Sequence, residues 1–142
     1  MNNKLLKSVI AGIVATIAMT AMMMIGAKMG MPKMEPPKTL AITMGAPMAV
    51  GWVMHFMIGI VLALMYSYFF RGLLSKVSSV FLKGVIFGII ALVFAKIGMS
   101  VMGMMFPDMP KPQGSMMPIL LAMTMGHILF GVVTTQMIHR ND

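Results

Sequence analysis

The sequence contains no cysteine and very few acidic residues. The absence of cysteine from 142 residues excludes disulfides, iron–sulfur clusters, cysteine-ligated zinc and thiol catalysis. Only three Asp and Glu side chains are present, which excludes hydrolysis by paired carboxylates and disfavours a carboxylate-based pump or transporter. No phosphate loop, dinucleotide fingerprint or serine elbow occurs. We therefore expect that the chain is not an enzyme.

Charged residues are also scarce, at 10% of the chain, whereas 59% of the residues are hydrophobic. A soluble domain carries about 25% charged residues, and so short a chain cannot hide this apolar excess in a water-soluble core. The formal net charge is +8, but the basic residues stand singly at the ends of apolar runs, as they do beside membrane helices. This pattern indicates a lipid bilayer as partner and no nucleic acid.

Four apolar stretches are long enough to cross a membrane as helices, since a spanning helix needs about 20 residues. The continuous runs exclude the alternating pattern of barrel strands. We interpret the first run as a retained helix rather than a signal peptide, because it is long and no cleavage site follows it. The sequence predicts an all-α, polytopic membrane four-helix bundle in a single domain, 1–142, with helices at Leu5–Ala27, Met48–Phe70, Val80–Phe106 and Pro118–Ile138.

Proline and glycine in the connectors 28–46 and 107–117 are expected to stop these helices, and residues 71–79 are expected to form a short basic turn with Arg71 and Lys76. Lysine and arginine set the orientation, because cytoplasmic loops carry an excess of them. The two ends and the 71–83 turn carry six basic residues, against four in the other two connectors. We expect a bacterial inner membrane protein with both termini in the cytoplasm.

An internal repeat is the second organising feature. Residues 7–13 (KSVIAGI) match residues 83–89 (KGVIFGI), and residues 55–59 (HFMIG) match residues 127–131 (HILFG). A proline-methionine block at Pro32 matches one at Pro107 in the same order. Three blocks in one order predict two tandem helical hairpins, 5–70 and 80–138, related by a two-fold axis along the membrane normal.

These residues resemble a known family of proteins. The segment Gly-Trp-Val-Met-His-Phe-Met-Ile-Gly at 51–59, the methionine-rich end of the first helix and the second His-x-x-x-Gly motif resemble a family of small bacterial four-helix integral membrane proteins of unknown function. The resemblance covers nearly the whole chain. It implies the fold and a membrane location, and it implies no activity and no catalytic residues.

His55 and His127 are the first candidate site residues. Each lies about 12–13 Å along its helix from the nearer end, at equivalent positions of the two repeats. Ionisable residues inside a membrane usually face the bundle interior. One interpretation is a hydrogen bond to another helix, for instance to Thr16 or Thr20. Another is paired ligation of copper or of haem b, and a third is a proton or quinone role.

Methionine is the second signal. Of 23 methionines, twenty fall within Met19–Met57 and Met99–Met125, towards one side of the bilayer. Thioethers are soft ligands for Cu(I), although methionine also serves as adaptable packing material. The methionines that we select as candidate ligands are Met19, Met23, Met34, Met109 and Met123.

Lys96 and a set of glycines complete the candidates. Lys96 falls inside the third helix, where a lysine either snorkels outward or contacts an anion such as a headgroup or a haem propionate. Small residues at four-residue spacing let membrane helices pack closely, and they predict that the first and third helices lie near the pseudo-axis. The expected packing glycines are Gly12, Gly59, Gly84, Gly88 and Gly131.

Three functions remain open after this reading. The favoured one is a structural or accessory protein in a membrane complex, with other membrane subunits as partners. The named alternative is binding of a soft metal or haem by the histidine pair and the methionines. A small-solute channel formed by an oligomer is the third, although four helices leave little room for a pore in one copy.

Overall fold

The computed structural model describes residues 3–140, and within this range it contains helices and no strands. Four helices are long and apolar enough to cross a membrane. These are α1 (Asn3–Lys28), α3 (Met48–Met65) with its continuation to Leu73, α5 (Val80–Met105) and α6 (Met116–His139). The prediction of an all-α bundle of four membrane-capable helices is therefore confirmed.

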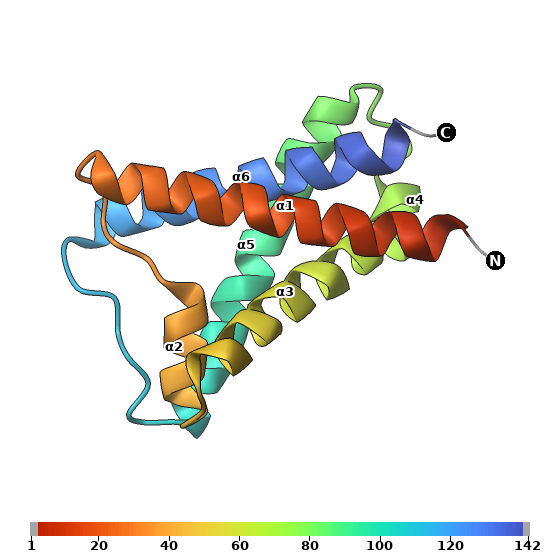
Figure 1. Cartoon of the computed structure of the whole chain (residues 1–142). Helices are drawn as coiled ribbons and strands as arrows, with labels where there is room; N and C mark the ends of the chain where they lie inside the picture. Colours follow the sequence, from red (N-terminus) through yellow and green to blue (C-terminus); the bar gives the residue numbers. More distant parts are fainter. Residues whose placement is uncertain (1–2, 141–142) are drawn as a thin grey trace.

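The helices form a bundle that opens towards one end. Helices α1 and α6 run side by side, whereas α3 and α5 slope away from them (Figure 1). The first turn of α1, the 71–79 turn and the last turn of α6 lie together, and we call this the terminal end (Figure 1). The connectors 29–47 and 106–115 lie at the opposite end, which we call the loop end.

Glycines mark where helices touch. A Cβ on Gly12 would lie 2.7 Å from the Cα of Ile60, so α1 and α3 are in backbone contact. A Cβ on Gly131 would collide with the carbonyl oxygen of Gly84, so α5 and α6 are equally close. Helix α1 therefore packs on α3 and α6 rather than on α5. The small residues Gly12 of α1 and Gly84 of α5 face α3 and α6, their own hairpin partners, and the expectation that the first and third helices lie near a pseudo-axis stays a prediction.

A π-helical segment, η1 (Tyr66–Phe70), joins α3 to the short helix α4 (Arg71–Leu73). A π-turn shifts the helical register, and here it turns Tyr66 and Phe70 into the core. The ring centroid of Tyr66 lies 4.9 Å from that of Phe87 on α5. Aromatic packing thus holds the helices together near the terminal end, while the loop end stays open.

The proline-rich connector 28–46 contains a helix that the sequence analysis missed. Helix α2 (Pro36–Thr43) begins with two consecutive prolines in its first turn. Proline is tolerated there, because a first-turn N–H has no partner within the helix. Helix α2 packs on α3, where a side chain on Gly51 would collide with the carbonyl of Pro37.

Candidate functional site

Two histidine and two methionine side chains from three helices are buried inside the bundle. Met19 and Met23 come from α1, His55 from α3 and His127 from α6, and each is at most 8% exposed. With Thr20, these four residues form what we call the central cluster.

Thr20 determines which nitrogen of His55 carries the proton. Its hydroxyl donates to the carbonyl of Thr16 at 2.8 Å, so its single proton is already used. The Thr20 oxygen also lies 3.1 Å from the Nε2 of His55 and must accept there. His55 then carries its proton on Nε2, and Nδ1 keeps the lone pair. The interpretation in which His55 bonds Thr20 on another helix is confirmed.

His127 is held differently, by its own helix. Its Nδ1 lies 2.8 Å from the carbonyl oxygen of Met123, one turn earlier in α6. A carbonyl only accepts, so Nδ1 carries the proton and Nε2 keeps the lone pair. A hydrogen bond of this kind to one ring nitrogen is how proteins fix the tautomer of a metal-binding histidine.

Gly126 makes room for the two methionines. A Cβ at this position would lie 2.9 Å from the terminal methyl carbon of Met23 and 3.8 Å from the sulfur of Met19. Both side chains therefore lie against bare backbone of α6, at the residue that precedes His127. Two thioethers and two imidazoles, all neutral ligands, occupy one buried region.

A cavity of about 560 Å³ leads from the loop end to this region. Thr20 and Met23 belong to both the cavity wall and the central cluster. Three further methionines, Met24, Met34 and Met48, line the cavity together with Trp52, whose ring centroid lies 6.3 Å from that of His55. At the rim, Glu35 pairs with Lys33 at 3.3 Å and with Lys38 at 3.7 Å.

The other candidates lie outside the cluster. Met109 is buried in the connector 106–115, and Met123 contributes its backbone carbonyl. Lys96 is exposed on α5. Among residues 3–140, no group of three or more His, Cys, Asp and Glu side chains could hold a metal ion.

The sequence analysis overlooked two features. Gly126 was not selected, although a glycine beside a membrane histidine signals room for another side chain. The third histidine, His139, was passed over as well. Its Nε2 lies 2.9 Å from the hydroxyl oxygen of the buried Tyr66, which ties η1 to the last turn of α6.

Comparison with known proteins gives one match. A family model described as "Family of unknown function (DUF6789)" matches residues 2–142. No curated protein and no solved structure matches the chain. The resemblance to a family of unknown function thus holds for the whole chain, and the match carries no activity.

Proposed function

We propose that this chain, which belongs to the DUF6789 family of unknown function, is a non-enzymatic membrane protein that holds a soft metal ion of the Cu(I) class. The observation that carries the proposal is the central cluster, in which two thioethers and two imidazoles are all buried and each imidazole is held by a hydrogen bond. Thioether and neutral imidazole bind Cu(I) without losing a proton.

The chemistry of the ligands favours this ion over others. Mg²⁺ and Ca²⁺ prefer oxygen ligands, and structural zinc sites use thiolate, imidazole or carboxylate. The central cluster offers two sulfur atoms and no carboxylate. A monovalent ion is also less costly to bury than a divalent one, because desolvation increases with charge. Four methionines, Met23, Met24, Met34 and Met48, line the cavity at the loop end, and Met19 lies beside Gly126 next to it.

Haem fits these residues less well. A porphyrin between the histidines would need space on α6 that Met19 and Met23 already fill against Gly126. Ligation through Nε2 of both histidines would also break the bond between His55 and Thr20. The proposal therefore places copper ahead of haem b.

The test is a Cu(I) titration of the full chain in detergent, against a chromophoric Cu(I) chelator under reducing conditions. We expect one high-affinity ion per chain. The double variant Met19→Leu/Met23→Leu conserves volume and removes both sulfur atoms, so affinity should fall about tenfold or more. Elemental analysis of protein from cells grown without added metal should show copper in excess of iron.

Two exposed methionines provide the matched control. Met104 and Met105 on α5 are 82% and 68% exposed, and Met104→Leu/Met105→Leu makes the same chemical change away from the cluster. This control should keep wild-type affinity. Equal losses in both double variants would mean that Cu(I) binds methionines without selection, and the proposal would be wrong.

An accessory role in a larger complex is the second candidate, supported by the loop-end half of α5. No atom lies within 4 Å of a Cβ built on Gly98 or Gly103, and Lys96 on the same half-helix is exposed. Small residues on an unpacked membrane helix suit close approach by another helix. Crosslinking in native membranes should then capture a partner subunit, and Gly98→Leu/Gly103→Leu should abolish the capture while the monomer keeps its melting temperature.

A further inference from the structure

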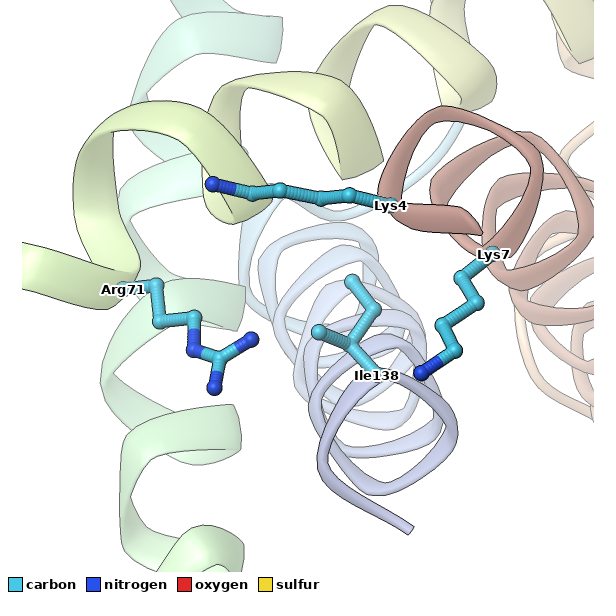
Figure 2. A pocket seen from close by; sticks show the side chains of 4 residues that line it. All are labelled: Lys4, Lys7, Arg71 and Ile138. Atoms are coloured by element: carbon cyan, nitrogen blue, oxygen red, sulfur yellow. The ribbon is translucent and has the colours of Figure 1, made fainter. Parts of the chain in front are cut away.

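The loop-end cavity leads to the central cluster, and it is also large enough to hold an organic ligand. Its volume of about 560 Å³ lies within the range of small-molecule sites, about 300–1,000 Å³. Its wall is formed by α1, α2, α3 and the connector that runs from α1 to α2 (Figure 1). A smaller cavity at the terminal end, of about 150 Å³, is lined by Lys4, Lys7, Arg71 and Ile138 (Figure 2). Of these two cavities, the one at the loop end has the room and the apolar wall for a ligand.

The wall of the loop-end cavity is held in place by backbone contacts. On one side, a Cβ on Gly51 would collide with the carbonyl oxygen of Pro37, so α2 lies directly on α3. On the other side, the N–H of Met31 donates to the carbonyl of Gly26 at 3.0 Å, which folds the connector back onto the end of α1. The space between α1 and α3 is therefore a fixed part of the fold.

Most of the side chains around this space are apolar. They include Met23, Met24, Met34, Met48 and Trp52, and three of these, Met24, Met48 and Trp52, are 60%, 48% and 38% exposed. Flexible thioethers adapt to the shape of an apolar ligand, and an indole ring adds a broad apolar face. A hydrocarbon chain in the cavity would cover apolar surface that the helices leave open.

The inner part of the cavity offers little to a polar group. Thr20 is the wall residue of α1 that lies farthest from the loop end. Its hydroxyl already donates to the carbonyl of Thr16 and accepts from Nε2 of His55. A ligand that enters from the loop end therefore gains most when its apolar part points inward.

The rim at the loop end has the opposite character, because it carries charge. Lys28, Lys33 and Lys38 belong to the wall together with Glu35. The single carboxylate of Glu35 is shared by Lys33 at 3.3 Å and Lys38 at 3.7 Å. Within residues 3–140, Lys28 makes no ion pair, although it ends α1 directly at the rim. After its internal pairing, the rim keeps a positive charge that complements one anionic group.

We propose that the loop-end cavity binds a fatty acid, with the hydrocarbon chain between α1 and α3 and the carboxylate at Lys28. The apolar wall accommodates the chain, and the basic rim accommodates the charge at the membrane surface, where lysines flank spanning helices. A phospholipid has two chains and a larger headgroup, so the cavity volume favours a single-chain occupant. The proposal goes beyond metal binding and does not depend on it, since methionine packs against hydrocarbon whether or not it also holds an ion.

The test is quenching of Trp52, the only tryptophan, by stearic acid that carries bromine in the middle of its chain. Bromine quenches indole fluorescence on contact, and Trp52 lines the cavity. The full chain is used without metal, in mild detergent and mildly alkaline buffer, which keeps the carboxylate ionised and lysine protonated. Quenching should saturate and should be reversed by excess unbrominated stearic acid. The neutral methyl ester of the brominated acid should quench weakly and without saturation.

A cavity-filling variant tests the position of the chain. Ala27 belongs to the cavity wall, so Ala27→Phe places a ring in the space that the chain would occupy. The half-saturating concentration should rise about tenfold, because the space is already filled. Ala49→Phe is the matched control, since Ala49 is exposed on α3 and lies outside the wall. It should titrate like the wild type. Equal losses in the two variants would overturn the proposal.

A charge variant tests the position of the carboxylate. Lys28→Gln should raise the half-saturating concentration about fivefold, the effect of one exposed ion pair, and Lys28→Arg should keep wild-type binding. Lys111→Gln removes one exposed cation from the other loop-end connector, outside the wall, and should change nothing. Because Lys28 is exposed, its variants should fold like the wild type. Saturable quenching by the neutral ester at the same concentrations, or equal effects of the two glutamine variants, would overturn the proposal.

Discussion

The Nε2–H of His55 donates to the oxygen of Thr20 at 3.1 Å, because the Thr20 proton is already committed to the carbonyl of Thr16. One threonine therefore joins α1 to α3 and also fixes the tautomer of the histidine. Its role differs from that of the Met123 carbonyl, which fixes His127 from within the same helix. The two histidines consequently present different ring nitrogens, Nδ1 and Nε2, to a ligand.

Thr20→Val tests this arrangement. Loss of the hydroxyl should lower the free energy of unfolding by about 1 kcal/mol, the scale of a hydrogen bond between membrane helices. Cu(I) affinity should fall about tenfold, since His55 loses the partner that orients its ring. Both are measured in detergent, by denaturant titration and by chelator competition.

Thr124→Val is the matched control. Thr124 bonds only the carbonyl of Leu120 on its own helix, at 2.8 Å, and it does not join two helices. Its replacement should leave Cu(I) affinity unchanged and alter stability by less than about 0.5 kcal/mol. Weakened folding with unchanged Cu(I) affinity in the Thr20 variant would show that His55 is a packing residue and not a ligand.

Gly131→Ala should be among the most damaging alanine substitutions in the chain. The new methyl group would collide with the backbone of Gly84, which cannot rotate away as a flexible side chain could. We expect a loss of about 2 kcal/mol or more, in the range for overpacking a tight interface. Gly98→Ala, in the open half of α5, should be neutral or stabilise by up to about 1 kcal/mol. Similar melting temperatures for the two variants would contradict the helix contacts described above.

The number and the bounds of the membrane-capable helices could be predicted, because the apolar runs have the length of a spanning helix and are separated by helix-stopping connectors. The four predicted spans start and end within a few residues of the observed helices, and α3 continues through η1 to Leu73. Helix α2 could not be predicted from composition, because the prolines that stop one helix begin the next. The pairing of helices was not predictable either, since a glycine stripe shows that a close contact exists and not which helix supplies it.

The candidate site was predicted only in part. Spacing placed Met19 and Met23 on one face of α1, and depth placed His55 and His127 at one level. Methionines of the central cluster and methionines of the connectors lie in the same methionine-rich parts of the sequence. Met109 in a connector was therefore selected for the same reason as Met23 in the cluster. Because Gly126 has no side chain, Met19 and Met23 of α1 can pack against the backbone of α6 beside His127. The sequence does not show this space, because it does not show that α1 and α6 lie side by side.

The orientation of the chain can be measured directly because it has no cysteine of its own. Single cysteines replace Ser75 at the terminal end and Ser115 at the loop end, both exposed. The excess of basic residues at the terminal end predicts that this end faces the cytoplasm. A membrane-impermeant maleimide applied to intact bacterial cells should label Ser115→Cys, and it should label Ser75→Cys only after permeabilisation. The reverse pattern would invert the proposed topology.

Tyr66→Phe removes the hydroxyl that bonds His139. Tyr66 is completely buried, and its oxygen lies 2.9 Å from the imidazole. We expect a loss of about 1 kcal/mol in the free energy of unfolding, which is the usual net contribution of one hydrogen bond. Tyr68→Phe is the control, because Tyr68 is 55% exposed and its ring remains available to Lys4. Equal melting temperatures for the two variants would show that the bond adds nothing to the bundle.

Trp52 is an internal reporter for the central cluster. It is the only tryptophan of the chain, it lines the loop-end cavity, and its ring lies 6.3 Å from that of His55. Silver(I) is a soft, air-stable substitute for Cu(I) and prefers the same thioether ligands. Titration with silver should therefore change the tryptophan fluorescence and saturate near one ion per chain.

The variants used for Cu(I) decide where that signal arises. In Met19→Leu/Met23→Leu, the fluorescence change should require about tenfold more silver, because two of the four proposed ligands are absent. Met104→Leu/Met105→Leu should titrate like the wild type, since these exposed side chains lie outside the cavity. If the cluster variant responds at wild-type silver concentrations, the ion that Trp52 detects sits among the cavity methionines and not between the histidines. The proposed metal site would then move to the loop end.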